Sequence, residues 1–118
     1  TYEDGRIIAD EIALKHRDID GVFAFTDLLA TGILVGLKEH GFKIPEDISI
    51  IGFSNWFLTT ITTPTLSTVD QPGFIMGEEA FKLLLEEINA IKKGNKPMYR
   101  TIEIPTKVIV RNSTKNLT

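Results

Sequence analysis

Polar pairs follow three apolar runs of the sequence, and their residue types and spacing could do chemistry. The runs and the pairs after them are 21–25 with Thr26-Asp27, 48–53 with Ser54-Asn55, and 66–69 with Asp70-Gln71. Short continuous apolar runs are typical of strands buried on both faces of a parallel sheet. Ligands of such sheets bind beyond the carboxyl ends of the strands. We therefore expect the three pairs to line one edge, where hydroxyl, amide and carboxylate groups could bind a sugar or a purine-like molecule.

Each of these residues also has a structural interpretation. Asp27 stands at the position of a helix N-cap, and Ser54-Asn55 could be turn formers. Trp56 could stack on a ligand, since it follows the second pair directly. Trp56 and Phe57 together are nevertheless more typical of packing or of a subunit interface.

Catalytic and cofactor chemistry has little support in the sequence. Gly52-Phe53-Ser54 begins like the nucleophile elbow of a hydrolase, yet Trp56 stands where that motif has its second glycine. His16 and His40 both fall near predicted helix C-termini, where the helix dipole favours a cationic ring. The sequence has neither GxGxxG nor GxxxxGK[ST], and its two histidines lack companions at metal-ligand spacing. We expect no enzyme activity, no cofactor and no metal site.

Predicted helices and strands alternate along the chain and would position the three polar pairs. Periodicity predicts helices over about 4–16, 28–40 and 74–92, a short helix or loop within 56–64, and strands over 21–25, 48–53, 66–69, 101–104 and 106–110. Thr1 or Asp4 could cap the first helix, and Gly41 and Gly94 fit helix ends. The polar tail from Asn112 is expected to fray. The alternation predicts an α/β fold with a mostly parallel sheet flanked by helices.

Composition bounds the class of protein. The 118 residues are 42% hydrophobic and 25% charged, and none is cysteine, which excludes disulfides and thiolate metal sites. No apolar run approaches the roughly 20 residues that cross a bilayer, and no signal-peptide pattern is visible. We therefore expect a cytoplasmic protein without a membrane partner. Residues 1–70 carry 5 basic against 11 acidic side chains, so we expect this chain not to bind nucleic acid itself.

Several stretches of the sequence form a recognisable pattern in order and with consistent gaps. They are 22–32, 37–41, 44–53, 64–72, Met76-Gly77 and 110–114. Together they cover nearly the whole chain, and the run Ile44-Pro45-Glu46-Asp47 to Phe53 is the most specific of them. The pattern resembles the lactose-repressor/galactose-repressor (LacI/GalR) family of bacterial transcription regulators.

The resemblance implies part of a two-lobed sensor domain, similar to type I periplasmic sugar-binding proteins. Residues 1–70 and about 100–112 would then belong to the second lobe, and the segment of about 71–99 would pack on the first lobe. A helix-turn-helix headpiece that reads operator DNA would be absent from this chain. The resemblance also implies a small-molecule effector, commonly a sugar or sugar derivative, and a homodimer.

The resemblance also assigns roles to individual residues. It implies effector contacts at Thr26, Ser54 and Gln71, with Asp27 and Asn55 beside them. Thr26 replaces the usual Asn, and Ser54-Asn55 replaces the usual Asp-Asp, so a hydroxyl stands where a carboxylate would accept sugar hydroxyls. That exchange points to a larger, differently held or phosphorylated ligand. The implied dimer contacts are Thr31, Leu34, Val35, Trp56, Phe57 and Ile61.

The long helix predicted near residues 73–93 would lack its usual first-lobe partner in this chain. We expect its apolar stripe, which includes Leu84 and Ile88, to be covered by another copy, a swapped element or a rearranged contact.

The leading hypothesis is the effector-sensing and dimerisation portion of a ligand-responsive transcription regulator. A periplasmic-type sugar-binding protein of the same fold is the alternative, which an upstream signal peptide would support and a helix-turn-helix would contradict. An α/β hydrolase or transferase is a third reading, and it would need a base near Ser54.

Overall fold

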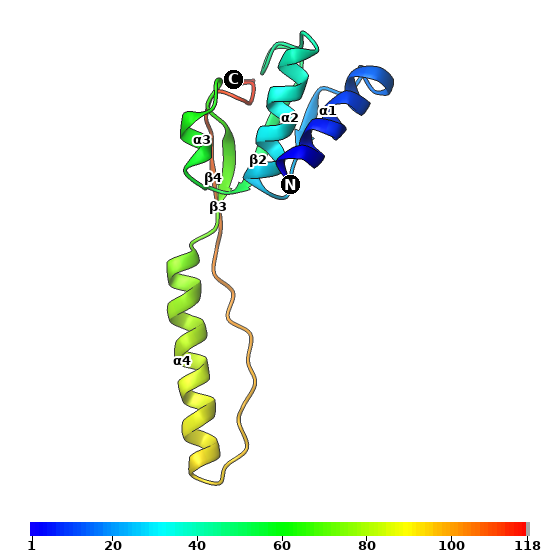
Figure 1. Ribbon diagram of the computed structural model, residues 1–118. Helices are drawn as coiled ribbons and strands as arrows, with labels where there is room; N and C mark the ends of the chain where they lie inside the picture. The colour runs from blue at the N-terminus through cyan, green and yellow to red at the C-terminus, as the bar shows by residue number, and fades with distance from the viewer. Residues whose placement is uncertain (118) are drawn as a thin grey trace. The chain divides into compact units, whose positions relative to one another are not determined.

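The computed structural model describes residues 1–117. The chain forms two compact units (Figure 1). Unit 1 comprises Thr1–Gln71 and Lys107–Thr118, and unit 2 comprises Pro72–Thr106. In chain order the elements are α1 (Tyr2–Lys15), β1 (Gly21–Phe23), α2 (Asp27–Glu39), β2 (Ser49–Ser54), α3 (Leu58–Ile61), β3 (Ser67–Asp70), α4 (Gly73–Lys92) and β4 (Lys107–Ile109). All but α4 belong to unit 1.

Unit 1 is built on one sheet with the strand order β1-β2-β3-β4. The first three strands are parallel: Phe23 pairs with Ile51, and Ser54 pairs with Asp70. Strand β4 returns antiparallel to β3 and places Lys107 opposite Asp70. The predicted α/β fold with a mostly parallel sheet and flanking helices is confirmed.

Local side-chain chemistry sets where the first two helices begin. The Thr1 hydroxyl accepts from the Asp4 N–H at 3.1 Å, and the Asp4 carboxylate bonds back to Thr1, so both predicted cap residues share one capping box. The bond from the Thr1 hydroxyl lowers the pKa of Asp4. At α2 the Thr26 hydroxyl accepts from the Leu29 N–H at 3.2 Å. The interpretation of Asp27 as the cap is therefore wrong, because Thr26 fills that position and Asp27 is already helical.

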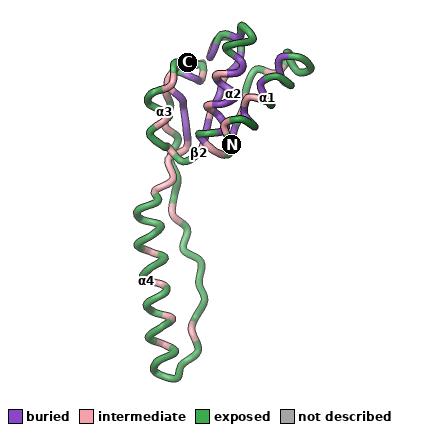
Figure 2. The backbone as a smooth tube through the Cα atoms, in the orientation of Figure 1, coloured by how far each residue is buried: buried purple, intermediate pink, exposed green. Residues whose placement is uncertain are grey.

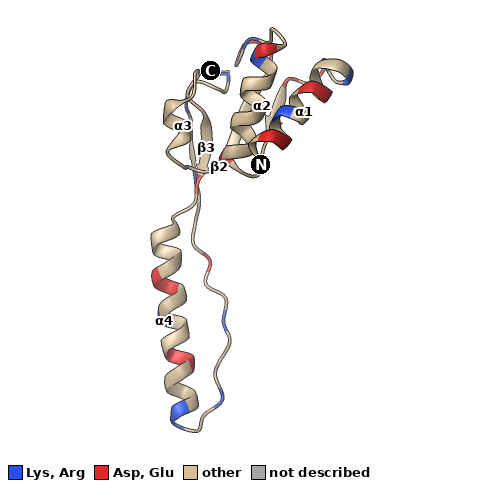
Figure 3. Ribbon diagram, viewed as in Figure 1, with Lys and Arg blue, Asp and Glu red and all other residues tan. Residues whose placement is uncertain are grey.

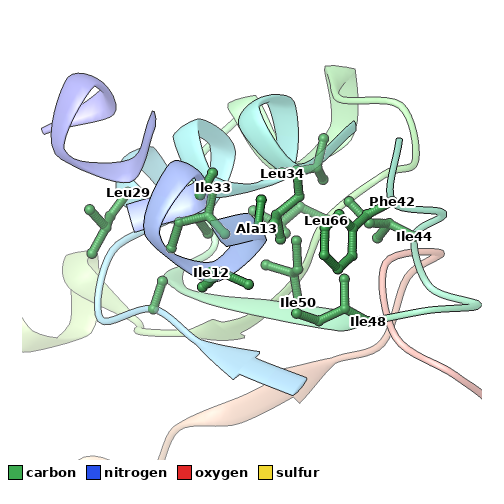
Figure 4. Close-up of a cluster of buried hydrophobic side chains, with 14 residues drawn as sticks. Ile12, Ala13, Leu29, Ile33, Leu34, Phe42, Ile44, Ile48, Ile50 and Leu66 are labelled. Carbon is green, nitrogen blue, oxygen red and sulfur yellow. The ribbon is translucent and has the colours of Figure 1, made fainter. Parts of the chain in front are cut away.

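The core of unit 1 lies between the sheet and the pair of helices α1 and α2 (Figure 4). Close approach of the two helices requires glycine, since a Cβ added at Gly32 would lie 3.0 Å from the Cα of Gly5. The buried hydrophobic side chains are those of Ala9, Ile12, Ala13, Ala24, Leu29, Ala30, Ile33, Leu34, Leu37, Phe42, Ile44, Ile48, Ile50 and Leu66.

Within the described part of unit 1, α1 and α2 pack on one face of the sheet and the other face stays partly exposed. Along β2, Ile50 and Gly52 are buried, whereas the alternating Ile51 and Phe53 stay partly exposed. Side chains of a strand alternate between faces, so the exposed set belongs to the uncovered face. Phe23 of β1 lies in this set with 62% exposure. The prediction that the first strand is buried on both faces is therefore wrong for this chain.

The structure settles one open choice and corrects two predictions for the segments before and after β3. Within 56–64 the structure forms one helical turn, α3, which resolves the open choice between helix and loop. No strand forms over 101–104, where a strand was predicted, because β3 offers pairing partners only to Lys107–Ile109. The predicted fraying from Asn112 is also wrong for Ser113, which is fully buried with its hydroxyl donating to the Ile50 carbonyl at 2.6 Å.

Unit 2 contains α4 and the extended segment after it (Figure 2). None of the residues of α4 is buried, and Leu84 and Ile88 are 51% and 37% exposed. Gly94 follows the helix with a φ of 75°, as predicted for a glycine stop. Leu84 and Ile88 thus keep accessible surface, and the cover of the apolar stripe by another copy, a swapped element or a rearranged contact stays a prediction. Among the described residues, no helix is both long and apolar enough to cross a membrane.

Candidate functional site

The structure brings the three predicted polar pairs to one edge of the sheet, at the carboxyl ends of β1, β2 and β3. The Ala24 N–H donates to the Ile51 carbonyl at 2.9 Å, so the chain stays beside β2 until Thr26 begins α2. Ser54 ends β2 opposite Asp70, and Gln71 follows at the end of unit 1. Ser54 is exposed and Asp27 is buried, whereas the other edge residues are half-buried: Thr26, Asn55, Asp70 and Gln71.

A turn with unusual backbone angles forms the middle of this edge. Ser54 and Asn55 have positive φ values of 115° and 56°, a region that L side chains rarely adopt. Such a residue costs roughly 1–3 kcal/mol, so the surrounding contacts must hold the turn in place. The Asn55 N–H donates to the Thr68 hydroxyl at 3.2 Å, and the Asn55 amide nitrogen donates to Asp70 at 3.0 Å. The turn formers predicted here are thus fixed by neighbouring β3.

Asp27 lies beneath the edge and supports the turn from below. Its side chain is 2% exposed, and its carboxylate accepts from the Trp56 N–H at 2.7 Å and from the Thr68 hydroxyl at 2.6 Å. Gly52 leaves the room for this carboxylate, because a Cβ there would run into it. Within this chain the Asp27 oxygens hold Trp56 and Thr68, and the predicted effector contact at Asp27 stays a prediction.

Arg111 completes the network and is a residue that the sequence reasoning missed. Its guanidinium donates to the Asn55 amide oxygen and to the Leu66 carbonyl, both at 2.9 Å. The backbone N–H of Arg111 donates to the Ser67 hydroxyl at 2.8 Å. The only local signal was a cation directly after an apolar strand, and the contact with Asn55 spans 56 residues of sequence.

The predicted dimer contacts fall into an exposed set and one buried residue. Trp56 and Phe57 are 50% and 60% exposed and meet edge to face with ring centroids 5.1 Å apart. Ile61 on α3 is 66% exposed, and Thr31 and Val35 of α2 are partly exposed. Leu34 is the exception, since its side chain is 2% exposed and packs in the core (Figure 4). Its predicted contact with a partner subunit stays a prediction, because Leu34 also lines the cavity described next.

A shallow apolar cavity lies beside the dimer-contact residues, between α2 and the segment after α3. Its volume is about 360 Å³, and its lining is formed by Leu34, Val35, Lys38, Glu39, Thr62 and Thr63. The Thr62 hydroxyl is buried and has no hydrogen-bond partner within the described chain. An unpaired buried hydroxyl is unfavourable, so this surface is better suited to contact than to open solvent.

Groups for acid–base or metal chemistry do not gather at the edge. The ring of His40 bonds the Asp10 carboxylate at 2.7 Å on the surface of α1 and α2, and His16 caps the end of α1. Among residues 1–117 no group of three or more His, Cys, Asp or Glu side chains could hold a metal ion. Figure 3 marks the positions of Lys and Arg along the ribbon, and they are interspersed with those of Asp and Glu. The groups at the edge are hydroxyls, amides and the carboxylates of Asp27 and Asp70, all of which are suited to hydrogen bonding.

Comparison with known proteins agrees with this geometry. The sequence matches the family described as "Periplasmic binding protein-like domain" over residues 2–114. It is 34% identical over 111 residues to the HTH-type transcriptional repressor PurR of Vibrio parahaemolyticus, covering 94% of this chain and 32% of that protein. It is 37% identical over 115 residues to the NTD biosynthesis operon regulator NtdR of Bacillus subtilis, covering 97% of this chain and 34% of the relative.

Solved structures give the same result. The complex of the transcriptional regulator CelR with cellobiose superposes with a TM-score of 0.83 at 30% identity, over 96% of this chain and 33% of that one. This chain thus spans about a third of the length of each of these relatives. The chain belongs to the periplasmic binding protein-like domain family, in the form found in LacI-family transcription regulators.

Proposed function

We propose that this chain is the effector-sensing and dimerisation portion of a ligand-responsive transcription regulator. The observation that carries the proposal is the fixed turn Ser54-Asn55, which holds an exposed hydroxyl at the carboxyl edge of the parallel strands. Thr26 follows β1 and Gln71 follows β3, the two strands that flank β2. Sheets of this class bind ligands at this edge. The relatives named as repressors and operon regulators support the same assignment.

The proposed effector is a sugar or sugar derivative. Hydroxyl and amide groups at Thr26, Ser54, Asn55 and Gln71 both donate and accept hydrogen bonds, as sugar hydroxyls require. CelR, a relative by structure, is bound to cellobiose. The hydroxyl of Ser54 adds no negative charge to the edge, so a larger or phosphorylated sugar is also compatible with it.

Because this chain spans about a third of the length of its relatives, we propose that the remaining roles need further segments like theirs. In this proposal residues 1–70 and about 100–112 belong to one lobe of the sensor, and the segment of about 71–99 packs on the other lobe. Operator DNA is contacted by a separate headpiece. A regulator acts where the genome lies, so we propose a cytoplasmic location and no catalytic role.

A homodimer forms, in this proposal, through the exposed side chains of α2, α3 and the segment between β2 and α3. These are Thr31, Val35, Trp56, Phe57 and Ile61, and the cavity beside them would be covered by the partner subunit. Sedimentation velocity of Ile61→Asp should show dissociation into monomers. Ile7→Asp on α1 is the matched control, because Ile7 is 64% and Ile61 is 66% exposed. A parent chain that sediments as a monomer, or equal effects of the two variants, would contradict this interface.

Thermal unfolding in the presence of cellobiose, lactose, ribose and adenine tests the effector site. A ligand at a hundredfold excess over its Kd stabilises the folded state by about 2.7 kcal/mol, which raises the melting temperature measurably. Ser54→Ala should abolish the shift and leave the ligand-free melting temperature near that of the parent, because the Ser54 side chain is exposed. Asn112→Ala is the control, since this exposed amide lies near the amino end of β2.

Two outcomes would redirect the assignment. A shift that survives Ser54→Ala unchanged would place the ligand elsewhere. The full-length protein could bind a sugar that has no effect on operator binding. That result would favour the alternative, a periplasmic-type sugar-binding protein.

A further inference from the structure

Arg111 joins two segments that are distant from it in the sequence: the turn after β2, and the start of β3. Its side chain bonds the Asn55 amide oxygen after β2 and the Leu66 carbonyl before β3. Its backbone N–H bonds the Ser67 hydroxyl within β3. Arg111 itself follows β4, so it belongs to the part of the chain that returns after unit 2.

The Asn55 side chain connects a cation to a carboxylate. Its oxygen accepts from Arg111 and its nitrogen donates to Asp70, so both ends of the amide are engaged and its orientation is fixed. Asn55 also has the positive φ that turns the chain away from β2. With its side chain held on two sides, the backbone at Ser54 is held as well.

We propose that Arg111 is a positioning residue for the effector site, acting through Asn55 to hold the exposed Ser54 hydroxyl where an effector meets it. The expected effect of Arg111 on effector binding rests on the function proposed above. The expected effect of Arg111 on the turn concerns the ligand-free chain. The consequence is that effector affinity depends on a residue that does not touch the effector.

Arginine suits this role better than lysine. The planar guanidinium presents several N–H groups in fixed directions, so it can serve the Asn55 oxygen and the Leu66 carbonyl together. An ammonium group is a compact charge on a flexible stem and lacks that fixed fork. Arg111→Lys should therefore retain the positive charge and part of the function, and Arg111→Met should retain only the length of the side chain.

Trp56 provides a spectroscopic reporter of the turn, because it is the only tryptophan in the chain and follows Asn55 directly. In the ligand-free chain, we expect Arg111→Met to shift Trp56 emission and to change the three-bond HN–Hα couplings of Ser54 and Asn55, which report φ. Arg111→Lys should give intermediate values. Lys115→Met is the matched control, since Lys115 is an exposed cation whose backbone bonds Ser49 at the start of β2, away from the turn, and it should leave these signals unchanged.

A rescue experiment separates positioning from general destabilisation. Glycine adopts positive φ without strain, so Asn55→Gly should keep the turn without help from Arg111. In the Asn55→Gly background, Arg111→Met should change Trp56 emission far less than it does in the parent chain. Equal changes in both backgrounds would overturn the positioning role. The Arg111→Lys couplings serve as the test if Arg111→Met does not fold.

Titration with cellobiose completes the test. We expect Arg111→Met to weaken binding at least about tenfold, which corresponds to 1.4 kcal/mol, and Lys115→Met to leave it unchanged. If Arg111→Met alters the turn and cellobiose still binds with parental affinity, the link between the turn and the ligand is refuted. If the parent does not bind cellobiose, the cellobiose form of the proposed function fails, and the couplings and the rescue decide the role of Arg111 on their own.

Discussion

Gly32 sits where α1 and α2 approach backbone to backbone, and replacing it with alanine gives a sharp test of the helix packing. A Cβ at this position would lie 3.0 Å from the Gly5 Cα and 3.1 Å from the Tyr2 carbonyl carbon, and closer still to the Tyr2 oxygen. Ordinary carbon contacts lie at about 3.5–4.0 Å. The atoms in the way belong to the backbone of α1, which cannot rotate aside, so the two helices must separate.

Two opposing free energies set the expected magnitude. Alanine in place of glycine in a helix interior is favourable by about 1 kcal/mol, through helix propensity alone. Overpacking of a well-packed contact costs about 1–3 kcal/mol, and the upper value applies here because the neighbouring atoms are rigid. We expect Gly32→Ala to lower the free energy of unfolding by about 2 kcal/mol net, which is about 10 °C in melting temperature for a domain of this size.

Gly77→Ala is the matched control, because Gly77 is also helical and a Cβ added there would meet nothing within 4 Å. Only the propensity gain applies, so this variant should strengthen α4 by about 1 kcal/mol. Urea unfolding followed by circular dichroism measures the effect at Gly32, and amide hydrogen exchange in α4 measures the effect at Gly77. A Gly32→Ala chain as stable as the parent would refute the close helix contact.

Three further predictions concern the caps and the core. Thr26→Ala removes the hydroxyl that accepts from Leu29 and should lower the free energy of unfolding by about 1 kcal/mol, and Thr26→Ser should restore most of it. Leu37→Ala should cost about 2–5 kcal/mol in urea unfolding, because the side chain is fully buried; a loss below about 1 kcal/mol would contradict its core position. The hydrogen bond from Thr1 lowers the pKa of Asp4, so the folded pKa lies below the unfolded one. The stabilisation by ionised Asp4 is complete above its ordinary pKa of about 4 and is lost as the pH falls through the lowered value. Acid titration of α1 helicity should show this loss, and Asp4→Asn should remove it.

Features decided by local chemistry could be predicted from the sequence. The helix predicted over 28–40 is Asp27–Glu39 in the structure, and Gly41 follows it with a φ of 84°. Its apolar periodicity, the hydroxyl at its start and the glycine at its end lie within one segment. The gathering of polar pairs at one edge was also predictable, because parallel strands end on the same side.

Features decided by distant partners were not predictable. Alternating apolar residues over 101–104 indicated a strand, but a strand needs a neighbour, and β3 pairs with the chain only from Lys107. The burial of Asp27, on α2, depends on space left by Gly52 on β2. The bond between Arg111 and Asn55 joins residues 56 positions apart in the sequence, and no local pattern near either residue indicates it.

The pairing of Asp70 with Lys107 has a consequence for how this architecture can vary. The chain leaves unit 1 just after Asp70 and returns at Lys107, and these two residues face each other across one antiparallel ladder. Paired residues of such a ladder lie about 4.5–5.5 Å apart at Cα, close enough for a tight hairpin to join them. Unit 2 is therefore topologically an insertion into a hairpin. Because the entropy of closing a loop grows slowly with its length, the inserted segment can be lengthened or exchanged while β3 and β4 keep their register.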